Sequence, residues 1–267
     1  MGDRPGRKLG YNPLAMQVRV GIERASLSDV GCQRDNNEDW YSYWEPESDE
    51  LLRKGRLAIV ADGMGGHEGG QEASRIAVES IEEVYSAAAA DGDPQDLLVA
   101  GFKAAHQRIQ QYADAHPALF GMGTTATAVV LFPAQLLYAH VGDSRLYLVR
   151  GSNITRVTHD HSYVGRLVDS GVITAEEADG HPQRHILTAA LGAGPEAEPE
   201  IGSAPIPLNA GDVLVLCTDG LWSLMEDEEL RQTVVQHAPP EACQALVEMA
   251  KQRGGPDNIT VQILRIS

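Results

Sequence analysis

The order of two hydrophobic patterns along the chain constrains its fold most. Apolar or alternating runs typical of strands cluster in the middle, with tight turns at FPAQ, GDSR and RGSN, whereas helical spacing comes in separate blocks. This distribution favours antiparallel sheets with helices packed outside them over strict βαβ alternation, so we expect a layered α+β fold. The predicted strands are 18–25, 57–61, 125–132, 136–141, 146–150, 213–218 and 259–266, and the predicted helices are 73–84, 94–115, 228–237 and 240–253.

Length and composition favour one intracellular domain. The chain has 267 residues, 43% of them hydrophobic, and no apolar span of 18 residues. The N-terminal sequence MGDRPGRKLGYNPLAMQ lacks the apolar core of a signal peptide, so we expect a cytoplasmic protein with no membrane segment. Cys32, Cys217 and Cys243 form no C-x-x-C pair, which fits a reducing compartment and packing roles.

The net charge limits the class of partner. With 21 Lys and Arg against 38 Asp and Glu, the formal charge is −17, which disfavours nucleic acid and anionic membranes as partners. Solubility is one explanation of this acidity. A cluster of carboxylates that requires cations is the other.

Two of the apolar runs, LAIVADG and VLVLCTDG, end in Asp-Gly. Asp-Gly usually marks a hairpin, but here a loop and then helical spacing follow each pair, so the hairpin interpretation fails. A carboxylate at a strand end, followed by a glycine that frees the backbone carbonyl, suits a hard cation. Asp62 and Asp219 are therefore candidate metal ligands, although a turn or cap role would explain either one alone.

Three further acidic residues stand at similar positions. Glu38 and Asp39 are adjacent, and successive strand side chains point to opposite faces, so we expect only one of them to bind an ion directly. Asp257 follows a Gly-Pro turn just before the last strand, where a cap or Asx-turn role is the alternative. Packing Asp39, Asp62, Asp219 and Asp257 together without cations would be costly, and two divalent ions would neutralise them.

A glycine-rich stretch follows the first Asp-Gly. Five glycines lie within residues 63–70, directly after an apolar run and directly before an amphipathic one. Glycine weakens helices and strands but allows close approach to the main chain. The stretch predicts a shaped loop that binds something.

Eight motifs together resemble the metal-dependent protein serine/threonine phosphatases of the PPM (PP2C-like) family, in its bacterial form. In order they are RDNNED, DGMGGHEGGQEAS, GMGTTAT, VGDSRLY, THDHS, LTAALG, CTDGLW and GGPDNIT, spread over roughly residues 23–266. The resemblance implies a four-layer αββα sandwich of two antiparallel sheets flanked by helices. It also implies two Mn²⁺ or Mg²⁺ ions at one end of that sandwich.

The resemblance also implies roles for individual residues. Asp62 would bridge the two ions and the Gly63 carbonyl would bind one of them, while Asp219 and Asp257 would hold the other. Asp39 would bind directly or through water, with Glu38 in the outer shell. Asp143, otherwise an ordinary turn residue, would help Asp219 to hold a weaker third metal. Arg34 would bind the substrate phosphate, which a planar guanidinium suits.

The expected chemistry is attack by a metal-activated water, which needs no protein nucleophile. None of the cysteines begins a C-x5-R motif, so a thiolate route is not encoded. Met64 occupies the position at which many eukaryotic relatives carry a histidine, and His67 follows three residues later as a proton donor or substrate contact. His159 and His161 form an H-x-H pair typical of zinc sites, but we favour a structural or outer-shell role for them.

The predicted organisation is an N-terminal extension at 1–17 and a phosphatase domain at 18–267, with a flap at about 161–194 beside the active site. In the flap, His185 and Ala190 replace the Asn and Arg common in relatives. We expect a monomer that acts on phosphoserine and phosphothreonine proteins and opposes a Ser/Thr kinase. A hydrolase of small phosphate esters and a phosphoprotein-binding relative without turnover are the alternatives.

Overall fold

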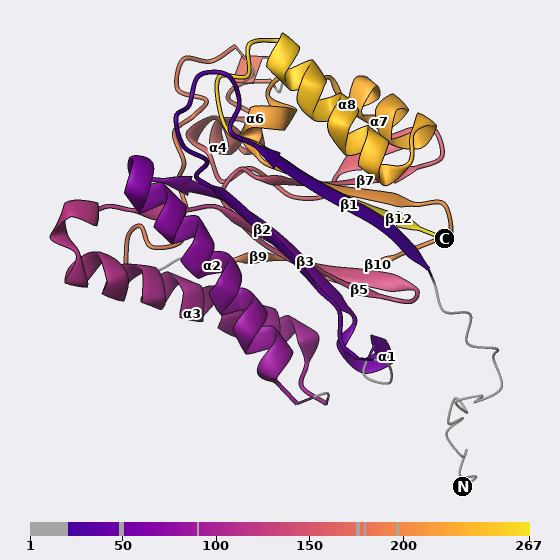
Figure 1. Cartoon of the computed structure of the whole chain (residues 1–267), viewed down its shortest axis with the longest axis horizontal. Coiled ribbons are helices and arrows are strands. Elements are labelled where there is room, and N and C mark those ends of the chain that lie inside the picture. Colours follow the sequence, from indigo (N-terminus) through magenta and orange to yellow (C-terminus); the bar gives the residue numbers. More distant parts are fainter. Residues whose placement is uncertain (1–20, 48–50, 90, 175–176, 179, 196–197) are drawn as a thin grey trace, which may run out of the picture.

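Two antiparallel sheets, packed face to face and covered by helices on both outer sides, form the molecule (Figure 1). The computed structural model describes residues 21–47, 51–89, 91–174, 177–178, 180–195 and 198–267. The predicted four-layer α+β sandwich is therefore confirmed. The predicted extension at 1–17 lies outside the described residues.

The first sheet has the strand order β1-β12-β11-β7-β8, and all of its pairings are antiparallel. Sheet order differs from chain order, because the C-terminal strand lies between the first strand and β11. The bounds are β1 (Ile22–Asp29), β7 (Arg145–Arg150), β8 (Asn153–Arg156), β11 (Val213–Cys217) and β12 (Ile259–Ile266).

The second sheet has the order β10-β6-β5-β3-β2, with β4 paired to β3 and β9 paired to β6. Its edge strand β2 was not predicted. The bounds are β2 (Asp39–Trp44), β3 (Arg56–Met64), β4 (Gly123–Thr124), β5 (Ala126–Phe132), β6 (Gln135–Val141), β9 (Glu200–Ile201) and β10 (Ile206–Pro207).

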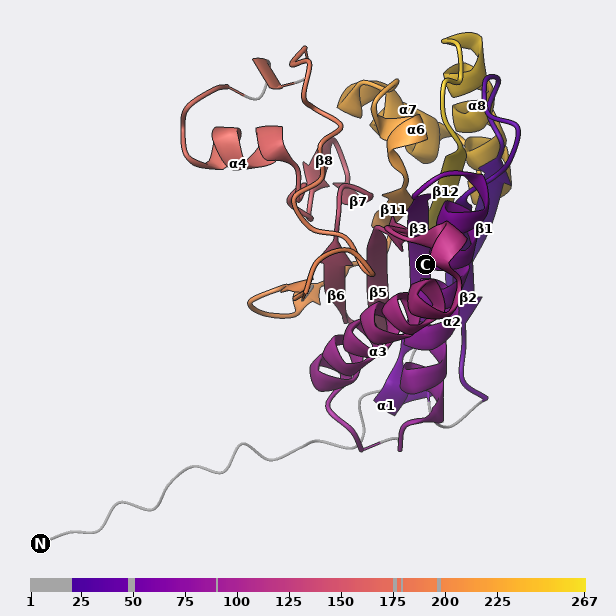
Figure 2. The ribbon, with the colours of Figure 1, turned by 90° about the vertical axis from the view of Figure 1, so that its left-hand side faces the viewer.

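Each sheet has its own pair of long helices on its outer face (Figures 1 and 2). Helices α2 (His67–Ala87) and α3 (Pro94–Ala115) cover the second sheet, and α7 (Asp227–Gln236) and α8 (Pro239–Gln252) cover the first. The shorter helices are α1 (Leu51–Lys54), η2 (Pro117–Leu119), α4 (Tyr163–Asp169) and α6 (Asp219–Trp222). Among the described residues, no helix is long and apolar enough to cross a membrane.

The continuous apolar runs reflect burial on both faces of a strand. In β3, Leu57 and Ile59 pack against the helices, whereas Ala58 and Val60 pack between the sheets. Strand β11 divides its side chains in the same way, with Leu214 and Leu216 facing the other sheet and the alternate residues facing helices. Antiparallel strands usually alternate apolar and polar residues, and covering both faces removes that alternation.

The cysteines differ in environment, so one prediction is wrong. Cys217 of β11 and Cys243 of α8 are both buried in the core between the first sheet and its helices, as expected. Cys32 is exposed and does not pack in a core. It lies in the turn after β1, where its Sγ contacts the Lys251 carbonyl at 3.8 Å.

Within segment 161–194, of which residues 175–176 and 179 lie outside the described ones, α4 stands away from the sandwich (Figure 2), while Leu191 near the end is buried in the core and pairs with Thr124. The role of this segment as a flap stays a prediction. Ser162 caps α4 by accepting a hydrogen bond from the Gly165 amide. The backbone of His161 bonds to Gly142 and Thr188, at 2.7 Å in both cases, which anchors the start of the segment to the end of β6.

The glycine-rich stretch is only partly a loop. Gly65 and Gly66 have positive φ angles of 119° and 80°, which reverse the chain after β3. Gly69 and Gly70 instead lie inside the first turn of α2. A Cβ on Gly63 would collide with the Gly70 carbonyl, so these glycines let the helix approach the strand end closely.

We expect Gly63→Ala to destabilise the metal-free protein by about 1–3 kcal/mol, because the clash is with backbone that cannot rotate away. Urea unfolding followed by circular dichroism measures this loss. Gly180→Ala is the matched control, since a Cβ there meets nothing within 4 Å. Equal stability of the two variants would contradict the close approach described here.

Candidate active site

Five aspartates from distant parts of the chain meet at one end of the sandwich. The pairing of β2 with β3 sets Asp39 directly opposite Asp62. On the other sheet, Asp219 follows β11 and Asp257 precedes β12, and these two strands pair with each other. Asp143 stands in the turn between β6 and β7. Antiparallel neighbours end and begin at the same edge, which explains this convergence.

Burial and proximity raise the pKa values of Asp39, Asp62, Asp143 and Asp219. Desolvation raises the pKa of Asp39 to about 7, against the stabilising hydrogen bonds of Thr260 and Thr218. Desolvation followed by repulsion from Asp39 and Asp219 raises the pKa of Asp62 well above its usual value. The pKa values of Asp143 and Asp219 are also raised, first by burial and then by neighbouring aspartates.

Two of the carboxylate oxygens lack partners within the described part of the chain. Asp39 Oδ1 and Asp219 Oδ1 are fully buried and accept no hydrogen bond there. An unsatisfied buried oxygen of a charged group is costly, and a divalent cation is the partner that such oxygens suit. The donor set, all carboxylate and carbonyl oxygen, fits Mg²⁺ or Mn²⁺ and not a thiolate-bound metal.

Three threonines hydrogen-bond to Asp39 or Asp62, and none of them was among the predicted site residues. Thr218 Oγ1 donates to Asp39 Oδ2 at 2.9 Å. Thr125 Oγ1 accepts the Asp62 amide at 3.0 Å, and Thr124 Oγ1 donates to the Asp62 carbonyl at 2.7 Å. Each of these three threonines lies within the motif GMGTTAT or CTDGLW, and this is the signal that could have identified it.

Glu38 and Asp39 are both buried but point to different neighbours. Glu38 lies against Gly70 at the start of α2, and its carbonyl accepts bonds from the Gly63 amide and the Ser74 hydroxyl. Asp39 instead faces Thr218 of the other sheet. This difference agrees with the expectation that only one of the pair binds an ion directly.

Arg34 lies at the rim of the site, paired with one of the candidate ligands. Its Nη2 donates to Asp257 Oδ2 at 2.8 Å, and its side chain is 45% exposed. The guanidinium therefore stands next to the carboxylates and remains accessible from solvent.

Two further histidines, His67 and His185, belong to segments next to the aspartates. His67 is the first residue of α2, directly after the glycine turn, and its side chain lies outside the described ones. His185, in segment 161–194, lowers the pKa of Asp219 by its proximity, against the larger effect of burial.

Both histidines of the H-x-H pair contact the same carboxylate, Glu200. His159 Nδ1 lies 3.0 Å from Glu200 Oε1 and His161 Nε2 lies 3.7 Å from Glu200 Oε2, and His161 and Glu200 form a cluster with His140. Buried His140 contacts Thr127 through Nδ1 and the Gly142 carbonyl through Nε2. Burial lowers the pKa of His140 to about 4, so this imidazole is neutral. The hydrogen bonds within the chain favour the structural role that we predicted.

Comparisons with known proteins agree with this geometry. Residues 35–252 match the family model described as protein phosphatase 2C. Protein phosphatase PhpP of Streptococcus pneumoniae is 35% identical over 92% of this chain and 98% of its own length.

Solved structures give the same result. The serine/threonine phosphatase PstP/Ppp of Mycobacterium tuberculosis superimposes with a TM-score of 0.81 and 36% identity, over 92% of this chain and 99% of that one. The catalytic domain of PstP in complex with two manganese ions superimposes with a TM-score of 0.78 and 35% identity, over 92% of this chain and 98% of that one. The family match over residues 35–252 and the similarity over nearly the whole of these relatives show that the chain belongs to the protein phosphatase 2C family of metal-dependent serine/threonine phosphatases.

Proposed function

We propose that this chain removes phosphate from phosphoserine and phosphothreonine in proteins at the aspartate cluster, with two divalent cations bound there. The observation that carries the proposal is the pair of unpartnered, buried oxygens on Asp39 and Asp219, which a cation would satisfy. The manganese complex of PstP supports the same assignment by similarity. Mg²⁺ and Mn²⁺ both suit these oxygen ligands.

The proposed ligands form two neighbouring ion positions that share one aspartate. Asp62 would contribute to both ions, the Gly63 carbonyl and Asp39 would help to hold one of them, and Asp219 and Asp257 would help to hold the other, while Glu38 would lie next to these ligands without binding directly. When bound, the ions supply a water of lowered pKa as the nucleophile and neutralise charge on the phosphate. Asp143 and Asp219 are the proposed ligands of a weaker third ion.

Arg34 is the proposed phosphate-binding residue. Its guanidinium presents parallel N–H groups that match two phosphate oxygens. In this structure its Nη2 donates to Asp257, so a phosphate would bind through the other N–H groups of the guanidinium or would compete with that carboxylate. His67 is proposed as the proton donor to the leaving alkoxide or as a substrate contact.

The domain limits, the kinase that this enzyme opposes, a monomeric state and a cytoplasmic location stay predictions. We propose residues 18–267 as the phosphatase domain, with 161–194 as its flap.

Turnover of a phosphothreonine peptide, compared with that of a small metabolite phosphate, tests the proposed function. We expect the peptide to be the better substrate, with activity lost in excess chelator and restored by Mn²⁺ or Mg²⁺. Full activity after chelation and dialysis would contradict the metal-based mechanism. Preference for the small ester would favour the metabolite phosphatase, and phosphopeptide binding without turnover would favour the non-catalytic relative.

Asp143→Asn separates a turn residue from a metal ligand. Asn keeps the Asx-turn hydrogen bonds but removes the charge that holds a divalent ion, so we expect a folded variant that retains two tight metals and needs more Mn²⁺ for half-maximal rate. Unchanged Mn²⁺ dependence of Asp143→Asn would show that Asp143 is a turn residue and not a metal ligand.

Asp219→Asn should be more severe than Asp143→Asn, with turnover reduced by at least about 100-fold. The reason is that changing even the hydrogen-bond partners of metal ligands costs about 10–100-fold.

A further inference from the structure

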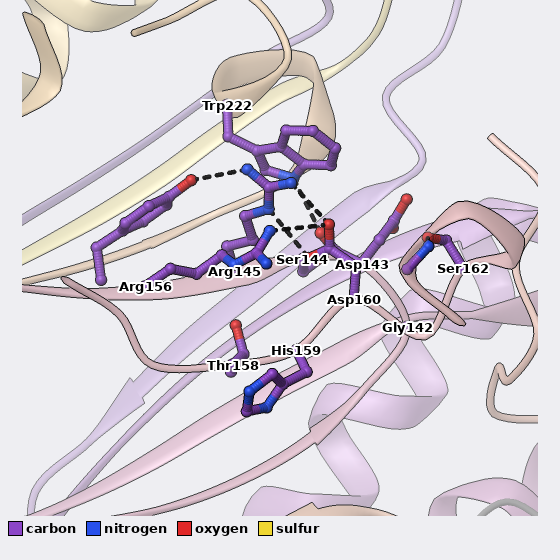
Figure 3. A network of polar contacts seen from close by, with 12 residues as sticks. Gly142, Asp143, Ser144, Arg145, Arg156, Thr158, His159, Asp160, Ser162 and Trp222 are labelled. Carbon is purple, nitrogen blue, oxygen red and sulfur yellow. Dashed lines mark hydrogen bonds and ion pairs between the residues drawn. The ribbon is translucent and has the colours of Figure 1, made fainter. Parts of the chain in front are cut away.

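A cavity of about 590 Å³ lies beside Asp143, between the flap and the first sheet. Arg145 of β7, Asp160 before the flap and Trp222 of α6 all line it. Figure 3 shows these side chains converging next to the Asp143 turn. None of the three has a role in the chemistry described above, yet each touches an element that carries a proposed ligand or the flap.

Trp222 connects two of the proposed ligands. It is the last residue of α6, and Asp219 is the first residue of the same short helix. Its indole Nε1 donates a hydrogen bond to the backbone carbonyl of Asp143 at 2.9 Å. The indole therefore fixes the distance between the Asp143 turn and the helix that carries Asp219.

Arg145 connects Trp222 to the start of the flap. Its guanidinium carbon lies 3.4 Å from the centre of the Trp222 ring, a close cation–π contact. The same guanidinium forks onto Asp160, with Nε to Oδ1 at 3.0 Å and Nη2 to Oδ2 at 2.6 Å. The Arg145 and Asp160 side chains are only 13% and 12% exposed, so solvent screens this pair weakly.

Asp160 in turn positions the flap helix. A Cβ on Gly165 of α4 would lie 2.5 Å from the Asp160 carbonyl, so the helix packs directly on this residue. The next residue, His161, bonds through its amide to the Gly142 carbonyl at 2.7 Å. Movement of Asp160 would therefore move both α4 and the chain before Asp143.

We propose that Arg145 and Trp222 are positioning residues that hold the Asp143 turn and Asp219 at a fixed separation and tie both to the flap. Metal binding at Asp143 and the position of the flap then depend on each other. The metal part of this inference rests on the proposed role of Asp143 as a ligand of a third ion.

The chain offers a matched control on the same strand. Arg150, at the other end of β7, forks onto Asp212 with Nε to Oδ1 at 2.9 Å and Nη2 to Oδ2 at 2.6 Å. That ion pair lies away from the aspartates. Arg150→Lys therefore removes a comparable fork without touching Trp222 or the flap.

The test compares Arg145→Lys, Trp222→Phe, Arg150→Lys and Asp143→Asn in the full chain. Lysine loses the fork on Asp160, and phenylalanine keeps an aromatic ring but loses the bond to Asp143. For both we expect the Mn²⁺ concentration at half-maximal phosphopeptide turnover to rise about tenfold, with kcat largely restored at saturating Mn²⁺. Calorimetry should still give two tight metals, and the flap amides should exchange hydrogen faster in the metal-free protein.

Arg150→Lys should lose stability but keep the wild-type Mn²⁺ dependence and flap exchange. If Arg145→Lys and Trp222→Phe behave in the same way, their role is packing alone and the inference is wrong. If Asp143→Asn itself leaves the Mn²⁺ dependence unchanged, Asp143 does not hold a third ion, and the proposed link between metal binding and the position of the flap is wrong. Phosphopeptide hydrolysis by the wild type is measured in the same series, so failure of the proposed function is seen separately.

Discussion

Repulsion among buried carboxylates at one end of the sandwich is the constraint on which the rest of the structure depends. Asp39, Asp62, Asp143 and Asp219 all have raised pKa values, because burial and their mutual repulsion oppose ionisation. The strands hold them together in spite of this cost, through antiparallel pairing and the threonines beneath them. This electrostatic cost is the physical reason to expect divalent cations at the site.

Much of the fold follows from hydrophobic pattern, because strands buried on both faces leave a strong signal. The runs at 57–61 and 213–218 are such strands, and the structure places both inside their sheets, with a paired strand on either side. Strand β2, with the sequence DWYSYW, was missed. It is an edge strand with Trp40 and Tyr41 both 38% exposed, so its pattern lacks the apolar continuity of the central strands.

Asp62, Asp143, Asp219 and Asp257 were predictable candidates because each stands at a strand end or in a turn that the sequence marks with Gly or Pro, and Asp39, which has no such neighbour, was predictable from the motif RDNNED. Their supporting residues were not, since contacts such as Trp222 with Asp143 depend on which strands are neighbours. The same limit applies to Arg145, whose partner Asp160 is 15 residues away. Glycine content predicted a loop at 63–70, but two of the glycines serve helix packing instead.

Proton release on Mn²⁺ binding tests the central claim most directly. Asp39, with a folded pKa of about 7 and an ordinary unfolded value, stabilises the metal-free fold only at low pH and loses this contribution as the pH rises through about 7. Metal binding requires the ionised form, so it should expel protons. Calorimetric titration in buffers of different ionisation enthalpy should show proton release at pH 6 that shrinks by pH 8.5 and is smaller in Asp39→Asn. Binding without proton release at either pH would contradict the account.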